Sequence, residues 1–167
     1  MGTPTRIPAD HATPSDELCW RSATELAAGM RAGILSPVAL TEAVLQQIER
    51  LNPDLNAYVT VTAEAARDAA SEAERAVERG ADRLGPLHGI PVSIKDMIRT
   101  AGVRTTSGSR LKADFVPEDD APSVERLKAA GAIVIGKTNT PDHGWLGVTD
   151  NPLFGVTRNP WDLERTP

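Results

Sequence analysis

Cysteine, histidine and aromatic residues are scarce in this sequence. Its 167 residues include one cysteine, Cys19, and aromatic residues make up 4% of the chain. A single cysteine excludes a disulfide or a cysteine metal cage within the chain. The histidines, His11, His88 and His143, are far apart and lack the close spacing of a zinc-binding pair. We therefore expect no metal site.

Long apolar runs and blocks of basic residues are absent as well. No stretch approaches the ~20 apolar residues that span a bilayer, and the N-terminus has no apolar signal core. Acidic residues number 23 against 18 basic ones, which gives a net charge of −5. The basic residues are spread along the chain, which opposes binding to nucleic-acid phosphates. We expect a cytoplasmic protein with neither a membrane nor a nucleic acid as partner.

The N-terminal region changes character after residue 21. Residues 1–21 hold three prolines and no periodic pattern, which predicts a flexible leader. Ser22 and Glu25 then form a capping-box pattern, and Gly33 follows a short apolar repeat. This combination predicts a short helix between them.

Helical and extended patterns alternate along the rest of the chain. A helix is predicted from Ser36-Pro37 to Asn52-Pro53, and its apolar stripe is interpreted as core: Leu40, Val44, Ile48 and Leu51. Further helices are expected at 63–79 and 120–130, and strands at 58–61, 91–94 and 132–135. This alternation predicts the α/β class.

The stretch of residues 85–96, GPLHGIPVSIKD, is the most informative in the chain. Two Gly/Pro pairs bracket a turn, and an apolar strand then ends on Lys95 and Asp96. We expect the strand to desolvate Lys95, and a desolvated amine has a pKa below its usual value of about 10.4. A neutral amine can accept a proton. The alternative is a lysine that is solvated or paired with Asp96.

A second stretch matches the P-loop pattern GxxxxGK[ST] letter for letter. Residues 131–138 read GAIVIGKT, so a nucleotide-binding protein is an alternative of a different class. A P-loop needs a strand before its first glycine, four residues that curl around phosphate, and a helix afterwards. Here a predicted helix precedes the motif, Ala-Ile-Val-Ile favours an extended backbone, and Thr-Asn-Thr-Pro follows. The context therefore opposes a phosphate site.

Five short sequence motifs, in their order along the chain, resemble those of the amidase signature family. They are GPLHGIPVSIKD, AGVRTTSGS, GKTN, NPLFG and RNPWD, and the resemblance runs from about Ser22 to the end of the chain. It implies helices around a mixed β-sheet, with residues 22–167 forming the N-terminal, incomplete part of an amidase signature domain.

The resemblance also implies a reaction. The family hydrolyses carboxamide C–N bonds of small-molecule amides with a Ser/cis-Ser/Lys triad and without a cofactor, and the lysine of its motif falls on Lys95. Lys95 would be the general base and acid. In sequences of the family, a motif like Glu-Arg-Thr-Pro is followed by a Gly/Ser-rich run and later by the nucleophilic serine. Neither feature is present in residues 1–167.

Several alternatives follow from that incompleteness. The chain alone is predicted to be inactive, as a truncated fragment would be. The family also includes subunits that deliver ammonia in transamidating assemblies, so amidotransferase partner subunits or a homodimer stay open.

Three nearby features are secondary site candidates. Residues 142–146 resemble a family segment that walls the substrate pocket, which makes Gly144 and Trp145 candidate substrate-binding residues; core packing is the alternative for Trp145. His143 stands where the family often has an aromatic residue. The hydroxyl-rich stretch 105–109 is either a capping turn or part of the surroundings of the triad. Met97 replaces a residue that is commonly polar.

Overall fold

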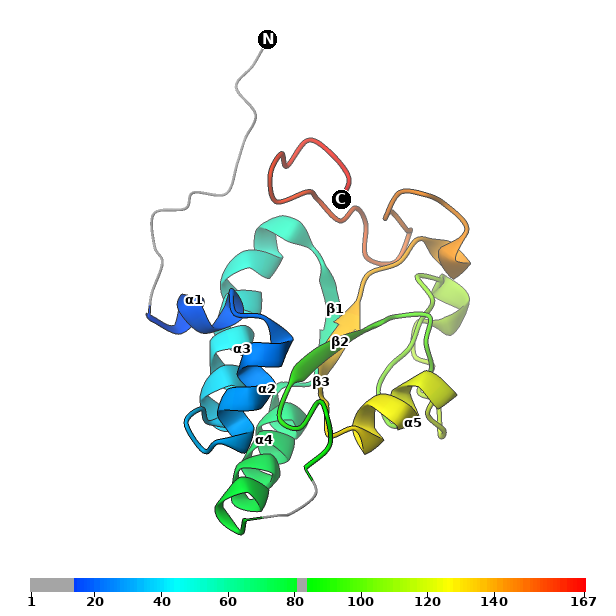
Figure 1. The fold of residues 1–167 in the computed structure, drawn as a ribbon. Helices are drawn as coiled ribbons and strands as arrows, with labels where there is room; N and C mark the ends of the chain where they lie inside the picture. The colour runs from blue at the N-terminus through cyan, green and yellow to red at the C-terminus, as the bar shows by residue number, and fades with distance from the viewer. Residues whose placement is uncertain (1–13, 81–83) are drawn as a thin grey trace.

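A three-stranded mixed sheet forms the centre of the molecule (Figure 1). The computed structural model describes residues 14–80 and 84–167. The strands are β1 (Tyr58–Val61), β2 (Pro91–Lys95) and β3 (Ile133–Thr138), in the order β1-β3-β2. β1 pairs antiparallel with β3, and β2 pairs parallel with it. The expected α/β class with helices around a mixed sheet is confirmed.

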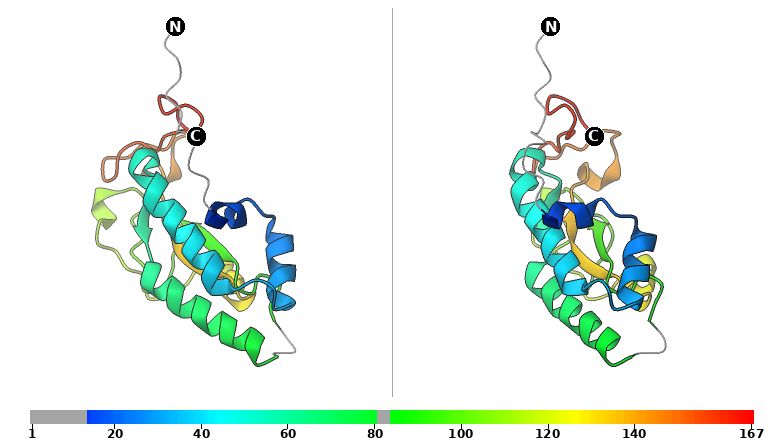
Figure 2. Two further views of the ribbon diagram at one scale, coloured as in Figure 1. Left: turned by 90° about the vertical axis from the view of Figure 1, so that its left-hand side faces the viewer. Right: turned by 60° about the vertical axis from the view of Figure 1, so that its left-hand side comes forward.

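Helices cover both sides of this sheet. α3 and α4 pack on one side and α5 lies on the other (Figures 1 and 2). The helices are α1 (Pro14–Cys19), α2 (Ala23–Arg31), α3 (Pro37–Leu55), α4 (Ala63–Glu78) and α5 (Pro122–Ala129), with 3₁₀ turns at Arg110–Lys112 and Asp142–Gly144. In the part of the chain that the structure describes, no helix is both long and apolar enough to cross a bilayer.

The two predicted helix caps, at Ser22 and Ser36, are confirmed. The Ser22 hydroxyl accepts from the Glu25 amide at 3.2 Å, and the Glu25 carboxylate accepts from the Ser22 amide at 3.0 Å, which completes the capping box. Ser36 caps α3, and Pro37 is its first residue. A proline is tolerated there because the first amides of a helix have no intrahelical acceptor.

The predicted end of α3 is wrong by one turn. The helix continues through Pro53 to Leu55, and Asn56 ends it in a left-handed conformation with φ of 52°. In the last turn, a proline removes only one intrahelical hydrogen bond. Asn56 also ties this end to the C-terminal part of the chain: its side chain donates to the Phe154 carbonyl at 2.8 Å, and its carbonyl accepts from the Thr157 hydroxyl at 2.7 Å.

The core consists of two clusters that meet at α3. Val44 packs against both of them. One joins α3 and α4 to β3 through Ile48, Ala66, Ala70, Ala73, Ile133 and Ile135, and the other joins α2 and α3 to the start of β2 through Leu26, Ala27, Met30, Leu40 and Ile90. Of the predicted stripe, Leu40 and Ile48 are buried and Leu51 is half-buried.

The expected leader differs from the structure where the two overlap. Pro14–Cys19 form α1, and Leu18 packs against the second cluster. Residues 1–13 lie outside the described residues. A proline is compatible with irregular chain, but at the first position of α1 it suits a helix start equally well.

We predict that Gly136→Ala destabilises the fold by about 1–3 kcal/mol, the usual cost of overpacking. A Cβ at this position in the middle strand would lie 2.4 Å from the Thr60 carbonyl oxygen of β1. Gly147→Ala is the matched control, because a Cβ there would meet nothing within 4 Å. Equilibrium denaturant unfolding followed by circular dichroism measures both, and equal midpoints for the two variants would contradict the prediction.

Candidate active site

Lys95 is the last residue of β2, and its side chain is exposed. Successive side chains of a strand point to opposite faces, so Ser93 and Lys95 face outward while Ile94 is buried. The expectation that the strand would desolvate Lys95 is therefore wrong for this chain. β2 is an edge strand of the described sheet, and the Lys95 side chain at its end is exposed in the described residues.

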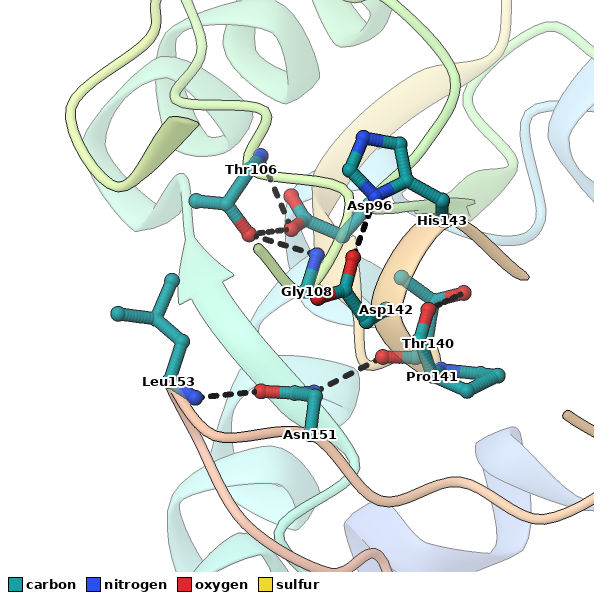
Figure 3. A network of polar contacts seen from close by, with 9 residues as sticks. All are labelled: Asp96, Thr106, Gly108, Thr140, Pro141, Asp142, His143, Asn151 and Leu153. Atoms are coloured by element: carbon teal, nitrogen blue, oxygen red, sulfur yellow. Dashed lines mark hydrogen bonds and ion pairs between the residues drawn. The ribbon is translucent and has the colours of Figure 1, made fainter. Parts of the chain in front are cut away.

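Asp96 follows Lys95 and is fully buried. Its amide donates to the Thr138 carbonyl of β3 at 2.9 Å, which extends the β2–β3 ladder by one bond. Its Oδ2 accepts from the Thr106 amide at 3.0 Å and from the Thr106 hydroxyl (Figure 3). The Thr106 hydroxyl in turn accepts from the Gly108 amide at 3.0 Å. Asp96 therefore caps the turn formed by residues 106–108 and is not a partner of Lys95.

The predicted capping turn in the hydroxyl-rich stretch is confirmed; a place near the triad stays a prediction. Thr105, Thr106, Ser107 and Ser109 are all buried. Ser107 has a left-handed backbone with φ of 56°, which is uncommon outside glycine and asparagine. The Ser107 amide donates to the Asp96 carbonyl at 3.0 Å, and the Ser107 carbonyl accepts from the His143 amide at 2.8 Å. The turn thus joins the segment after β2 to the segment after β3.

The segment 141–146 lies against the residues that follow Lys95. A Cβ at Gly144 would come within 3.1 Å of the Met97 Sδ and Cε atoms, so the glycine backbone packs directly on Met97. Trp145 is 87% exposed, which rules out core packing as its role in this chain. His143 is half-exposed, and its Nδ1 contacts the Asp142 carboxylate. Gly144 therefore packs on Met97, two residues after Lys95, and Trp145 follows Gly144 in the chain.

A cavity of about 400 Å³ opens beside Trp145. It is lined by Asp142, Trp145, Leu146, Asp150, Asn151 and Pro152. The Asn151 side-chain amide donates to the Thr140 carbonyl at 2.8 Å, and its side-chain oxygen accepts from the Leu153 amide at 3.0 Å (Figure 3). The same side-chain amide also donates to the Asn139 side chain at 2.7 Å. These bonds fix one wall of the cavity. A larger apolar groove of about 410 Å³ lies at the opposite end of β2, near Ile90 and Pro91, and is not part of this site.

The fully buried lysine of the described residues is Lys137, not Lys95. Lys137 lies on β3 with 0% exposure. Its Nζ donates to the Ile98 carbonyl at 2.6 Å, to the Thr105 hydroxyl at 2.8 Å and to the Thr100 hydroxyl at 3.0 Å. Burial lowers the pKa of Lys137 to about 8, although the negative charges of Asp96 and Asp120 oppose this shift. The sequence does not predict this burial, because the apolar run ends at Ile135, two residues before Lys137.

The location of Lys137 rejects the P-loop alternative. Residues 133–138 of the motif form β3, with no phosphate-cradling loop between the two glycines. The Lys137 amine is enclosed by the segment 98–105 and cannot reach a nucleotide. The helix α5 precedes the motif, and residues 139–141 after it are not helical. The letters match, but the conformation does not.

Comparisons with known proteins assign the family. The sequence profile of the Amidase family matches residues 39–167, and the chain belongs to this family. It is 44% identical over 146 residues to an acylamidase of Rhodococcus erythropolis, a match that covers 87% of this chain and 30% of the relative. It is 44% identical over 151 residues to one subunit of the glutamyl-tRNA(Gln) amidotransferase of Carboxydothermus hydrogenoformans, covering 90% of this chain and 31% of that relative.

Solved structures agree with this assignment. The fold superposes on fatty acid amide hydrolase with a TM-score of 0.86 and 27% identity, covering 91% of this chain and 27% of that one. It superposes on the peptide amidase of Stenotrophomonas maltophilia with a TM-score of 0.78 and 37% identity, covering 87% and 31%. The chain thus spans about a third of the length of the relatives that it matches.

We predict that Lys137 makes the stability of the fold depend on pH. The pKa of this lysine falls from 10.5, the ordinary value expected in the unfolded chain, to about 8 in the folded chain. Between these two pH values, the unfolded chain binds a proton that the folded chain has released. Stability therefore rises with pH across this window, by about 3 kcal/mol if this lysine acted alone.

The measurement is denaturant unfolding of the wild-type chain and Lys137→Met from pH 7 to 10.5. Subtraction of the two curves removes the groups that they share, such as Tyr58, whose pKa is raised by burial. The difference should grow in favour of the wild type as pH rises above about 8. A constant difference would contradict the prediction.

Proposed function

We propose that this chain contributes the catalytic lysine, Lys95, to an amidase that hydrolyses a carboxamide C–N bond by a Ser/cis-Ser/Lys mechanism. Membership of the Amidase family supports the reaction class. The observation that carries the assignment of Lys95 is its position: it ends β2 with an exposed side chain, two residues before Met97, on which Gly144 packs. Lys137, in contrast, is enclosed and has each of its donors engaged.

The proposed chemistry divides between this chain and the remainder of the family domain. Lys95, in its neutral form, accepts a proton relayed from the nucleophilic serine through the bridging serine, and the serine oxygen attacks the amide carbonyl. The lysine then returns the proton to the leaving nitrogen, and water hydrolyses the acyl-enzyme. Both serines belong to a segment with no counterpart in residues 1–167. The segment that carries them would also cover and desolvate Lys95.

The substrate is a small-molecule amide whose acyl or amine part lies against Trp145. The exposed indole gives a flat apolar surface that lines one side of the cavity of about 400 Å³. A second candidate is a component of a transamidating assembly, favoured by the 44% identity to the amidotransferase of C. hydrogenoformans. The exposed outward face of Lys95 is compatible with both, and neither requires a cofactor.

We predict that amide hydrolysis needs Lys95 together with the serine segment. The 167-residue chain alone should release no amine from an anilide. A fusion of this chain to the part of the R. erythropolis acylamidase that follows the aligned region should be active. In that fusion, Lys95→Ala should lower kcat by about 10²–10⁴-fold, the usual contribution of a general acid–base group.

Lys112→Ala is the matched control for charge, because Lys112 is also an exposed lysine outside the site. The fusion with this control should keep its full turnover. Amine release by the isolated chain that is lost on Lys95→Ala would refute the need for the serine segment. A fully active Lys95→Ala fusion would refute the role of Lys95.

Trp145 should affect substrate binding without affecting stability. Because its side chain is 87% exposed, Trp145→Ala should change the unfolding midpoint little, with a free-energy effect of about 0.5 kcal/mol or less. In the active fusion, KM for an aryl amide should rise several-fold. Trp20→Ala, at a tryptophan that is 83% exposed between α1 and α2, is the control. Equal KM values for the two variants would count against a role of Trp145.

A further inference from the structure

We propose that Lys137 is a positioning residue for Lys95: it fixes the segment 96–109, here called the post-lysine segment, and so holds the end of β2 in one place. The inference rests on the proposed function of Lys95. It gives a role to the lysine of the GKT motif, for which the P-loop alternative has been rejected. The hydrogen bonds of the Lys137 amine go to Ile98, Thr100 and Thr105, so its effect on Lys95 passes through the post-lysine segment.

The first support is the match between donors and acceptors. A protonated lysine has three N–H donors, and the three acceptors of Lys137 belong to the post-lysine segment: the Ile98 carbonyl and the hydroxyls of Thr100 and Thr105. The two hydroxyls donate their own protons elsewhere, Thr100 to the Ile98 carbonyl at 3.3 Å and Thr105 to the Val103 carbonyl at 2.9 Å. Their lone pairs are therefore available to the amine. The three hydrogen bonds hold the post-lysine segment at three of its residues.

The second support is the attachment of the same segment to β3 at its beginning. Lys95 is in register with Thr138, and the Asp96 amide donates to the Thr138 carbonyl at 2.9 Å. The Ile98 amide donates to the Lys95 carbonyl at 2.9 Å, which closes a turn on the lysine itself. Ile98 is thus bonded to Lys95 through its amide and to Lys137 through its carbonyl. Without the bond from the Lys137 amine to its carbonyl, Ile98 is held less firmly, and the Ile98–Lys95 bond that closes the turn is weakened.

The third support is the cost of having a lysine there. A buried ammonium loses its hydration, and an apolar side chain of similar length would fill the space without that penalty. Methionine would nevertheless take the amine donor from the part-buried Ile98 carbonyl, which would keep only the longer bond from the Thr100 hydroxyl. Burial of the Lys137 ammonium lowers the stability of the fold, yet the amine directs its three donors to the post-lysine segment. Both features fit a role in placing that segment.

The experiment compares hydrogen exchange of backbone amides in the full 167-residue chain and in Lys137→Met. Exchange in the post-lysine segment should speed up about tenfold or more, as expected when a local hydrogen-bonded unit is weakened. Exchange in α3 and α4 should change less. Lys112→Met, at an exposed lysine outside the segment, should leave both regions unchanged. A uniform increase over the whole chain, or no change in the segment, would overturn the proposal.

A milder variant keeps the test decisive if Lys137→Met does not fold. Thr105→Val is nearly isosteric and removes one acceptor of Lys137, the one at 2.8 Å. It should also speed up exchange in the post-lysine segment selectively, by a smaller factor. Equal exchange in Thr105→Val and the wild type would overturn the proposal regardless of the outcome for Lys137→Met.

Turnover separates this inference from the proposed function. In the fusion described above, Lys137→Met should lower kcat while KM stays within about twofold, because the substrate surface is untouched and only the placement of the base has changed. An inactive wild-type fusion refutes the proposed function, whereas the exchange result still decides whether Lys137 fixes the segment. Selective exchange together with unchanged kcat would overturn the link to Lys95.

Discussion

The pairing of β3 with both of its neighbours is the constraint on which the rest of the structure depends. β1 and β2 do not pair with each other and join one sheet only through β3. Ile133 and Ile135 bring the same strand into the core with α3 and α4. A strand in this position has no edge toward water, so its polar residues need partners inside the protein. Lys137 finds them in the segment 98–105, and Asn139, the residue that follows β3, finds them in Asn151 of the cavity wall and in Thr157.

The parts of the fold that can be predicted from the sequence are those with local causes. Helix starts depend on one side chain and an amide three residues away, and the caps at Ser22 and Ser36 both follow from such patterns. Short apolar runs predict the three strands, because β-branched and aromatic side chains are favoured on a partly buried sheet in any protein. The position of Lys95 at a strand end follows from the same pattern.

The errors have causes that lie far away in the chain. The pair Asn52-Pro53 predicts the end of α3, but the end of this helix is set by Asn56 and its bonds to residues about 100 positions later. The apolar run predicts that β3 ends at Ile135, yet residues 136–138 stay extended because β1 and β2 offer partners for them. The burial of Lys137 and the exposure of Lys95 depend on which strand is central, which no local pattern reveals.

The bonds between Asn56 and the segment 154–157 have a consequence for how the protein assembles during synthesis. β1 is made early, but β3, with which it pairs, appears more than 70 residues later, and the segment that secures Asn56 appears later still. Contacts this distant in sequence are slow to form, since a long loop must close before they bring any gain. On the ribosome, α3 and α4 can pair first, whereas β1 must wait as an unpaired strand with free amides and carbonyls. The unpaired β1 therefore needs protection against aggregation until β3 has emerged, and the Asn56 end of α3 is secured only after residues 154–157 follow.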